Sequence, residues 1–263
     1  MMLRIVAAVL LCLLSGIDTV YAADAAASAN AVAESMREAI FSEGFEARLN
    51  VFVTRASGAH PAPLKLAVIG QISADRQRLV IRGISPEAAR NRSYAVERGS
   101  DGRIRGVESR AAGEQNEFDP YARMFDSGLV ACDMLSPWWG WPKQFLEGME
   151  QIDGRDCLKL RSMTDDEKSP IREVESCVDQ QAKLSLKTRL FDSRHVLIRA
   201  TTVGKVMRKG DAGTMAAKKL TIRDAAKMLT EIEVYAGDEQ YEISADTFAA
   251  LDKLTHNEQQ KTK

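Results

Sequence analysis

The segments GRDCLKLRS (residues 154–162) and IREVESCVD (residues 171–179) decide the fold. Each alternates polar with apolar side chains, which is the pattern of a β-strand with one exposed face and one buried face. The stretch MTDDEKSP (residues 163–170) that joins them is polar and typical of a turn or loop. Together the three segments predict an antiparallel hairpin.

The charges of this hairpin predict its register. With Cys157 placed opposite Cys177, oppositely charged residues face each other: Arg155 with Asp179, Lys159 with Glu175, and Arg161 with Glu173. On the other face, Leu160 meets Val174. A shift of one residue would set these charges against apolar partners. We therefore expect a charged outer face and an apolar inner face, as in an antiparallel sheet with one side in water.

The same alternation recurs on both sides of the hairpin. Further strands are predicted at residues 45–53, 64–72, 76–84, 183–191, 195–203, 220–224 and 228–237, with weaker ones around Tyr94 and Ile104. A twisted sheet with so many strands curls toward a barrel. We therefore predict a mainly β (α+β) fold, a strongly curled antiparallel half-barrel of roughly ten strands.

Several segments are candidates to cover the apolar face of this sheet. Helical periodicity predicts helices at residues 30–43 and 243–254, and one or two helical turns at residues 118–125. SPWWGWP (residues 136–142) holds every tryptophan of the chain, and its prolines and glycine predict a bent loop. Full exposure of these indoles would create a large apolar patch. We therefore expect the loop to pack at the rim of the apolar face or to contact a ligand directly.

The N-terminal segment has the pattern of a secretory signal peptide. The basic stretch MMLR precedes the apolar run IVAAVLLCLLSGI, and small residues suited to cleavage end at Ala22. We expect residues 1–22 to be removed after about Ala22 and the protein to be exported to the periplasm. Residues 23–255 are then assigned to a single domain, and residues 256–263 to a disordered tail.

Three cysteines remain after the predicted cleavage. Because export permits disulfides, Cys157 and Cys177 are expected to form a structural disulfide, with a redox pair as the alternative. Cys132 is then left over, and its apolar surroundings favour a buried free thiol over a nucleophile.

Charge and motifs exclude several classes of function. The 36 Lys and Arg residues balance 37 Asp and Glu residues, so the net charge of -1 leaves no footprint for nucleic acid. The 3 histidines lack the spacing of metal ligands, and the sequence has no G-x-S-x-G or phosphate-binding glycine motif. We therefore expect no metal, no cofactor, no catalytic residues and no enzymatic activity.

The order of these elements resembles the outer-membrane lipoprotein-sorting proteins of the periplasmic lipoprotein-carrier superfamily. The resemblance is carried by the signal peptide, the first helix, the strands LKLAVIGQI and RQRLVIRGI, and the tryptophan-rich loop. It continues through GRDCLKLRS, VESCVDQQAKLSLKTRLFD, RHVLIRATTV, KKLTIRD, MLTEIEVY and the closing ISADTFAALDKL. It implies a half-closed sheet around an apolar cavity, with helices packed on the concave face as a lid, and a non-enzymatic protein that accepts the acyl chains of lipoproteins.

Site residues follow from the face that each strand turns toward this cavity. The expected cavity residues are Val53, Leu66, Val68, Leu79, Ile81, Leu160, Val174, Leu184, Leu186 and Ile198. The expected lid and rim residues are Trp138, Trp139, Trp141, Phe145, Phe248 and Leu251.

Two functions remain open at this point. The first is a monomeric periplasmic carrier that binds a lipid-modified protein or another acyl-chain ligand, involved in outer-membrane lipoprotein sorting, with membrane-bound donor and acceptor proteins as partners. The second is an envelope module of the same fold that binds a protein partner or senses stress, with its cavity filled by its own side chains.

Overall fold

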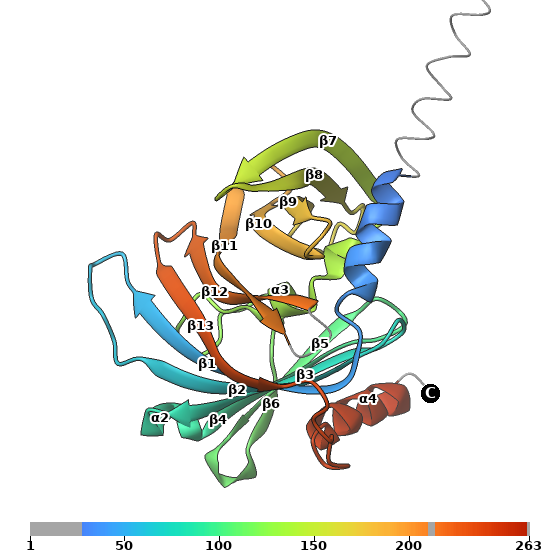
Figure 1. The fold of residues 1–263 in the computed structure, drawn as a ribbon. Helices are drawn as coiled ribbons and strands as arrows, with labels where there is room; N and C mark the ends of the chain where they lie inside the picture. Colours follow the sequence, from blue (N-terminus) through green and yellow to red (C-terminus); the bar gives the residue numbers. More distant parts are fainter. Residues whose placement is uncertain (1–27, 210–213, 262–263) are drawn as a thin grey trace, which may run out of the picture.

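The computed structural model describes residues 28–209 and 214–261, and the expected signal peptide lies outside them. One antiparallel sheet of 13 strands dominates the fold, which confirms a mainly β protein (Figure 1). Its first six strands are β1 (Ser42–Thr54), β2 (Leu64–Ile72), β3 (Gln77–Ser85), β4 (Arg92–Arg98), β5 (Ile104–Arg110) and β6 (Gln115–Glu117). The others are β7 (Lys143–Ile152), β8 (Arg155–Met163), β9 (Glu173–Asp179), β10 (Leu184–Phe191), β11 (Leu197–Lys209), β12 (Thr214–Asp224) and β13 (Leu229–Asp238).

The sheet is two meanders joined by their terminal strands. Its order is β6-β5-β4-β3-β2-β1-β13-β12-β11-β10-β9-β8-β7, so β1 pairs with β13 at the centre while β6 and β7 form the two edges. The chain must therefore travel from one edge of the sheet to the other between residues 118 and 142, and it does so on the concave side (Figure 1). The sheet curls without closing, as expected for a half-barrel.

The number of strands exceeds the expected ten because β6 and β7 carry weak signals. β6 is the short polar segment QNE, which has no apolar alternation. In β7 the register shifts between Leu146 and Met149, and Gly148 within that shift has φ 101°. Such a bulge breaks the period of two on which strand prediction depends.

The register of the β8–β9 hairpin differs from the expected one by two residues. Lys159 pairs with Cys177 and Arg161 with Glu175, where Glu175 and Glu173 were expected. A shift of two preserves the face of every side chain, so the apolar and charged faces lie where the sequence places them. Cys157 and Cys177 still form the expected disulfide, with Cα atoms 5.3 Å apart.

The concave face is covered by the N-terminal helix and by the connection between the sheet edges. The N-terminal helix spans residues 28–38, against 30–43 expected. Residues 118–125 form turns and bends in place of the expected helical turns, with Arg123 in an isolated β-bridge to Val130 and Phe125 at φ 53°, outside the helical region. The connection instead contains the short helix α3 (Ala131–Leu135) and the 3-10 turn η2 (Pro137–Gly140). Together they form most of the expected lid.

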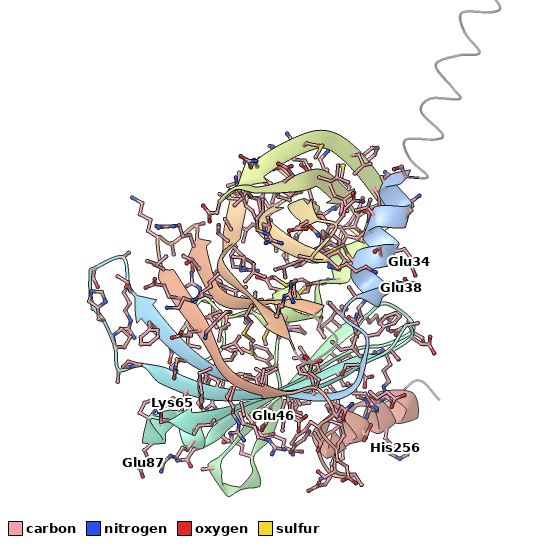
Figure 2. The ribbon with its side chains drawn as sticks, in the orientation of Figure 1. Glu34, Glu38, Glu46, Lys65, Glu87 and His256 are labelled. Atoms are coloured by element: carbon pink, nitrogen blue, oxygen red, sulfur yellow. A yellow bond between two sulfur atoms is a disulfide. The ribbon has the colours of Figure 1, made fainter. Side chains whose placement is uncertain are left out.

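The C-terminal helix does not belong to that lid, contrary to our expectation. Helix α4 (Ala249–Lys261) lies outside the curve of the sheet, on its convex side (Figure 1). Glu46, Lys65 and Glu87, labelled in Figure 2, lie on the same convex side. Phe248 and Leu251 pack there against Val80, Ala95 and Val107. Strands β3 to β5 thus bury apolar residues on both faces. The helix also continues to Lys261, where the sequence predicted a disordered tail from residue 256.

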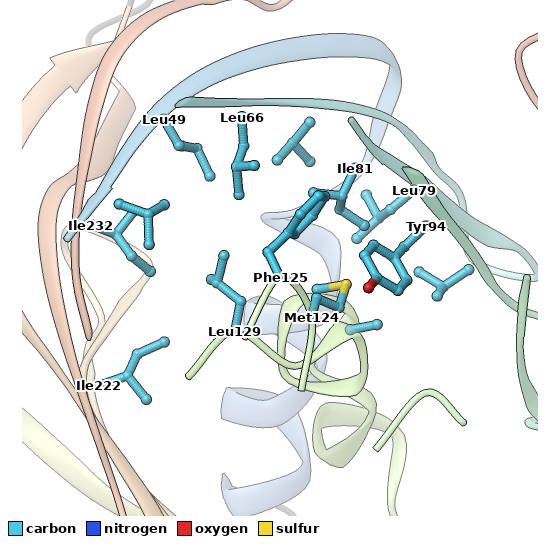
Figure 3. Close-up of a cluster of buried hydrophobic side chains, with 14 of the residues drawn as sticks. Leu49, Leu66, Leu79, Ile81, Tyr94, Met124, Phe125, Leu129, Ile222 and Ile232 are labelled. Atoms are coloured by element: carbon cyan, nitrogen blue, oxygen red, sulfur yellow. The ribbon is translucent and has the colours of Figure 1, made fainter. Parts of the chain in front are cut away.

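The concave core forms two adjacent clusters. The larger cluster joins strands β1 to β4 and β12 to β13 to residues of the connection, and Figure 3 shows Met124, Phe125 and Leu129 reaching into it. In the second cluster, Val32 and Met36 of the N-terminal helix pack with Trp138 and Trp139 onto strands β8 to β10. The space between these two clusters holds the candidate site.

Candidate ligand-binding cavity

A cavity of about 400 Å³ opens on the concave face between the two core clusters. This volume lies within the range of about 300–1,000 Å³ that is usual for small-molecule sites. Its lining is mostly apolar and comes from both halves of the sheet. The lining residues from the strands include Phe45, Ala47, Leu49, Val68, Ile72, Leu79, Leu184, Leu190, Val203, Leu220, Ile222 and Ile232.

The covering segments close the opposite side of the cavity. Met36 lies in the N-terminal helix and Ile40 follows it, while Leu129, Val130 and Met134 come from the connection and α3. Trp138 and Trp139 complete the wall, with ring centroids 6.0 Å apart in an edge-to-face arrangement. The cavity is therefore bounded by the sheet on one side and by the N-terminal helix and the connection between the sheet edges on the other.

The tryptophan turn is held in place by one buried amide. Gln144 of β7 donates from Nε2 to the carbonyl oxygens of Trp138, at 2.9 Å, and Trp141, at 3.0 Å. Its Oε1 accepts a 2.7 Å hydrogen bond from the Ser162 hydroxyl on β8. Ser136, with φ 46°, turns the chain from α3 into this structure. The sequence predicted the bent loop but gave no signal for its anchor.

A buried ion pair lies at the cavity wall, which also contains the polar residues Ser136, Lys183, Ser185, Thr188 and Thr201. Asp133 of α3 lines the cavity, and the Arg199 guanidinium of β11 donates to both carboxylate oxygens, at 2.5 and 2.7 Å. Burial raises the pKa of the Asp133 carboxyl, and the charge and hydrogen bonds of Arg199 oppose that shift. The sequence analysis missed this pair, although an acidic residue within the apolar segment LVACDML was a usable signal.

The structure places most of the expected cavity residues on the concave face. Val68, Leu79, Leu184, Trp138 and Trp139 line the cavity itself. The concave clusters bury Val53, Leu66, Ile81, Leu160 and Val174 behind that lining. Ile198 is partly buried against the second cluster.

Two further expected residues face the other side of the sheet. Leu186 packs beside Cys157 and Cys177 on the convex face, because a register shift between Ser185 and Lys187 reverses the alternation of β10. Phe145 is 41% exposed on the outer face of β7, with the Arg161 guanidinium 4.9 Å from its ring centroid. Leu186 and Phe145 therefore lie on the convex face, as do Phe248 and Leu251, although all four were expected in the cavity or the lid.

Trp141 and Cys132 also differ in role from the residues around the cavity. Trp141 leaves the cavity wall and lines a separate polar groove. Cys132 is buried beside the cavity lining, and burial raises the pKa of its thiol, so the thiolate needed for nucleophilic attack is disfavoured.

A possible metal-ligand cluster lies away from this cavity. The ligand atoms of Glu173, Glu175 and His195 lie within 4.8 Å of one another. Arg189 already forms an ion pair with Glu175, so a second cation there would meet a neutralised carboxylate.

Among the helices in the described part of the chain, none is both long enough and apolar enough to span a membrane.

Known proteins resemble this chain in structure rather than in sequence. No protein-family model and no curated protein sequence matches it. A DUF1329 family protein from Desulfovibrio piger superposes with a TM-score of 0.76 at 15% identity, over 85% of this chain and 97% of the other. A putative outer membrane lipoprotein-sorting protein domain from Vibrio parahaemolyticus gives 0.74 at 12% identity, over 85% and 97%. A LolA superfamily protein from Nitrosomonas europaea gives 0.66 at 15% identity, over 84% and 96%.

These matches confirm the resemblance inferred from the sequence at the level of the fold. At such identities they establish a shared half-barrel architecture, and the function has to be argued from the cavity.

Proposed function

We propose that this protein is a periplasmic carrier that holds the acyl chain of a lipid-modified protein, or a similar apolar ligand, in the concave cavity. The observation that carries the proposal is an apolar cavity between a curled sheet and its lid, in a fold shared with proteins described as lipoprotein-sorting. The signal-peptide pattern of residues 1–22 supports a periplasmic location.

Burial of an acyl chain would supply enough free energy for useful affinity. Each buried methylene contributes about 0.8 kcal/mol, so about ten of them contribute about 8 kcal/mol. Part of this offsets the lost freedom of the ligand. The remainder suits a carrier, which must release its ligand as well as bind it.

The same wall chemistry favours binding over catalysis. The lining is mostly aliphatic and aromatic, and both oxygens of its one carboxylate, Asp133, are bonded to Arg199. We infer a monomer that receives its ligand from one membrane-bound protein and delivers it to another, without a cofactor.

Displacement of a fluorescent fatty acid tests the proposal, together with native mass spectrometry of protein purified from periplasm. In Ala47→Phe, a phenyl group would occupy the cavity, and we expect displacement to weaken at least tenfold. Asn50→Phe adds the same group to the outer face of the same strand, where Asn50 pairs with Lys65 and Glu233, and should bind as the wild type does.

Absence of both bound lipid and displacement in the wild type would refute the carrier function. A stoichiometric protein partner recovered by crosslinking without lipid would instead support the interaction module. Equal loss of displacement in both phenylalanine variants would show that the fatty acid does not occupy this cavity.

A further inference from the structure

A second hollow, unrelated to the apolar cavity, lies beside the tryptophan turn. It is a groove of about 1020 Å³ between the β4–β5 turn, residues 117–121, the end of η2 and the β8–β9 loop. It shares no lining residue with the apolar cavity. Four basic side chains line it, namely Arg98, Arg103, Arg105 and Lys168, along with the aromatic rings of Phe118, Tyr121 and Trp141.

Arg98 is the unusual member of this set. Its Nε is buried without a hydrogen-bond acceptor, and no carboxylate within the described residues forms an ion pair with its guanidinium. A Cβ built on Gly140 would lie 3.0 Å from its Nη2, so the guanidinium lies directly against the backbone of the tryptophan turn. A buried N–H of a charged guanidinium without an acceptor is costly, which points to a missing partner.

None of the four acidic residues that line the groove forms an ion pair with Arg98 within the described residues. Asp101 accepts a 2.7 Å hydrogen bond from Arg105 Nη2. Asp119 and Asp166 each accept a backbone N–H two residues ahead, from Tyr121 at 2.9 Å and from Lys168 at 3.0 Å. Glu117 is exposed on the edge strand β6 and forms no ion pair with Arg98 in the described structure.

A second guanidinium on the N-terminal helix affects Arg98 electrostatically. Arg37 donates from Nη2 to Glu34 Oε1 at 2.6 Å, so its charge already has a partner. Its Nε is buried without an acceptor, as is that of Arg98. Burial lowers the pKa of the Arg98 guanidinium, and the positive charge of Arg37 lowers it further. Arg37 keeps Glu34 as its partner, whereas Arg98 has no acidic partner within the described residues, so an anion in the groove would be attracted chiefly by Arg98.

We propose that this groove binds a phosphate group, with Arg98 as its principal ligand. The planar guanidinium matches the oxygens of a phosphate, and Lys168 adds a second positive charge in the same groove. Trp141 and Tyr121 provide apolar surface for whatever the phosphate is attached to. The phosphate belongs either to a lipid headgroup or to a free phosphate compound.

Calorimetric titration at constant ionic strength tests this site, with the intrinsic tryptophan fluorescence, to which Trp141 in the groove contributes, as a second readout. Inorganic phosphate should bind the wild type saturably and more tightly than acetate. Arg98→Gln should weaken binding at least about tenfold, since hydrogen bonds to charged groups contribute about 1.5–3 kcal/mol. Arg194→Gln is the matched control, because Arg194 lies outside the groove, is 82% exposed and pairs with Asp192, and its loss should change affinity less than threefold.

Two further arms complete the experiment. Gly140→Ala keeps every charge but places a methyl group against Arg98, and it should also weaken phosphate binding. Dihexanoyl phosphatidate used as a monomer distinguishes the sources. Tighter binding than inorganic phosphate, lost in Arg98→Gln, supports a lipid headgroup, and equal binding supports a free phosphate. No saturable binding, acetate as tight as phosphate, or an unaffected Arg98→Gln would overturn the proposal.

Discussion

Asp133 on α3 and Arg199 on β11 form a bidentate ion pair that joins the lid of the cavity to the sheet beneath it. Both side chains are largely withdrawn from water, at 14% and 8% exposed. Loss of one partner leaves the other charge buried and unpaired, which costs about 3–5 kcal/mol.

We therefore expect Asp133→Ala to lower the free energy of unfolding by about 3 kcal/mol or more, measured by urea denaturation. The double variant Asp133→Leu/Arg199→Met should be less costly than either single change, because neither charge then remains buried. Lys143→Ala is the control: its pair with Asp165 is exposed and should contribute less than about 1 kcal/mol. A double variant as unstable as the sum of the singles would contradict the coupling.

Gln144 should determine how firmly the tryptophan turn is held. Gln144→Leu leaves the carbonyl oxygens of Trp138 and Trp141 and the Ser162 hydroxyl without this partner, so we expect a loss of at least about 2 kcal/mol. Acrylamide should then quench the tryptophans more strongly. Gln151→Leu removes one exposed hydrogen bond to Asp156 and should change stability by less than about 0.5 kcal/mol. Equal stability of the two variants would show that the turn is held by packing alone.

The face of each residue could be predicted from the sequence wherever a strand is regular. The shift of two residues between β8 and β9 shows the reason: the alternation fixes which side a residue takes, but it is the same in both registers. Charge complementarity did not decide between them, because only Arg161 and Glu175 are oppositely charged and directly opposite in the observed register. Arg155 still reaches Asp179, with Nη2–Oδ2 at 2.6 Å, although these residues are not directly opposite.

Irregular positions and packing between distant elements escaped prediction. Leu186 faces outward because of a bulge that its neighbours do not signal, and β7 was hidden by the bulge around Gly148. The Asp133–Arg199 pair joins residues 66 positions apart, so the local pattern around Asp133 could mark an unusual acidic residue but could not identify its partner. The amphipathic helix α4 was expected on the concave face because Val80, Ala95 and Val107 were not recognised as a second apolar surface.

The Cys157–Cys177 disulfide should contribute substantially to stability, independently of the cavity. Closure of a loop with a sequence separation of 20 stabilises the folded state by about 3 kcal/mol. The variant Cys157→Ala/Cys177→Ala should therefore unfold at lower denaturant concentration and lose its sensitivity to reductant. Cys132 is buried, so native protein lacking residues 1–22 should react slowly with thiol reagents and unfolded protein should release one thiol per chain. Two or three reactive thiols would contradict the disulfide.

A substitution at Phe248 would show whether this residue packs on the convex face or belongs to the lid of the cavity. Its ring packs with Leu251 on the outside of β3 to β5, and the Arg78 guanidinium lies 5.0 Å from the ring centroid. Phe248→Ala should lower the free energy of unfolding by about 3–5 kcal/mol, as large-to-small changes in a core do. Fatty-acid displacement, measured where the variant remains folded, should stay within twofold of the wild type, because the lost ring does not face the cavity. Leu79→Ala removes part of a side chain that lines the cavity. It should alter fatty-acid displacement while lowering the free energy of unfolding about as much as Phe248→Ala does. If Phe248→Ala changed displacement as strongly as Leu79→Ala, α4 would have to cover the ligand after all, and the convex packing of this helix would be wrong for the protein in solution.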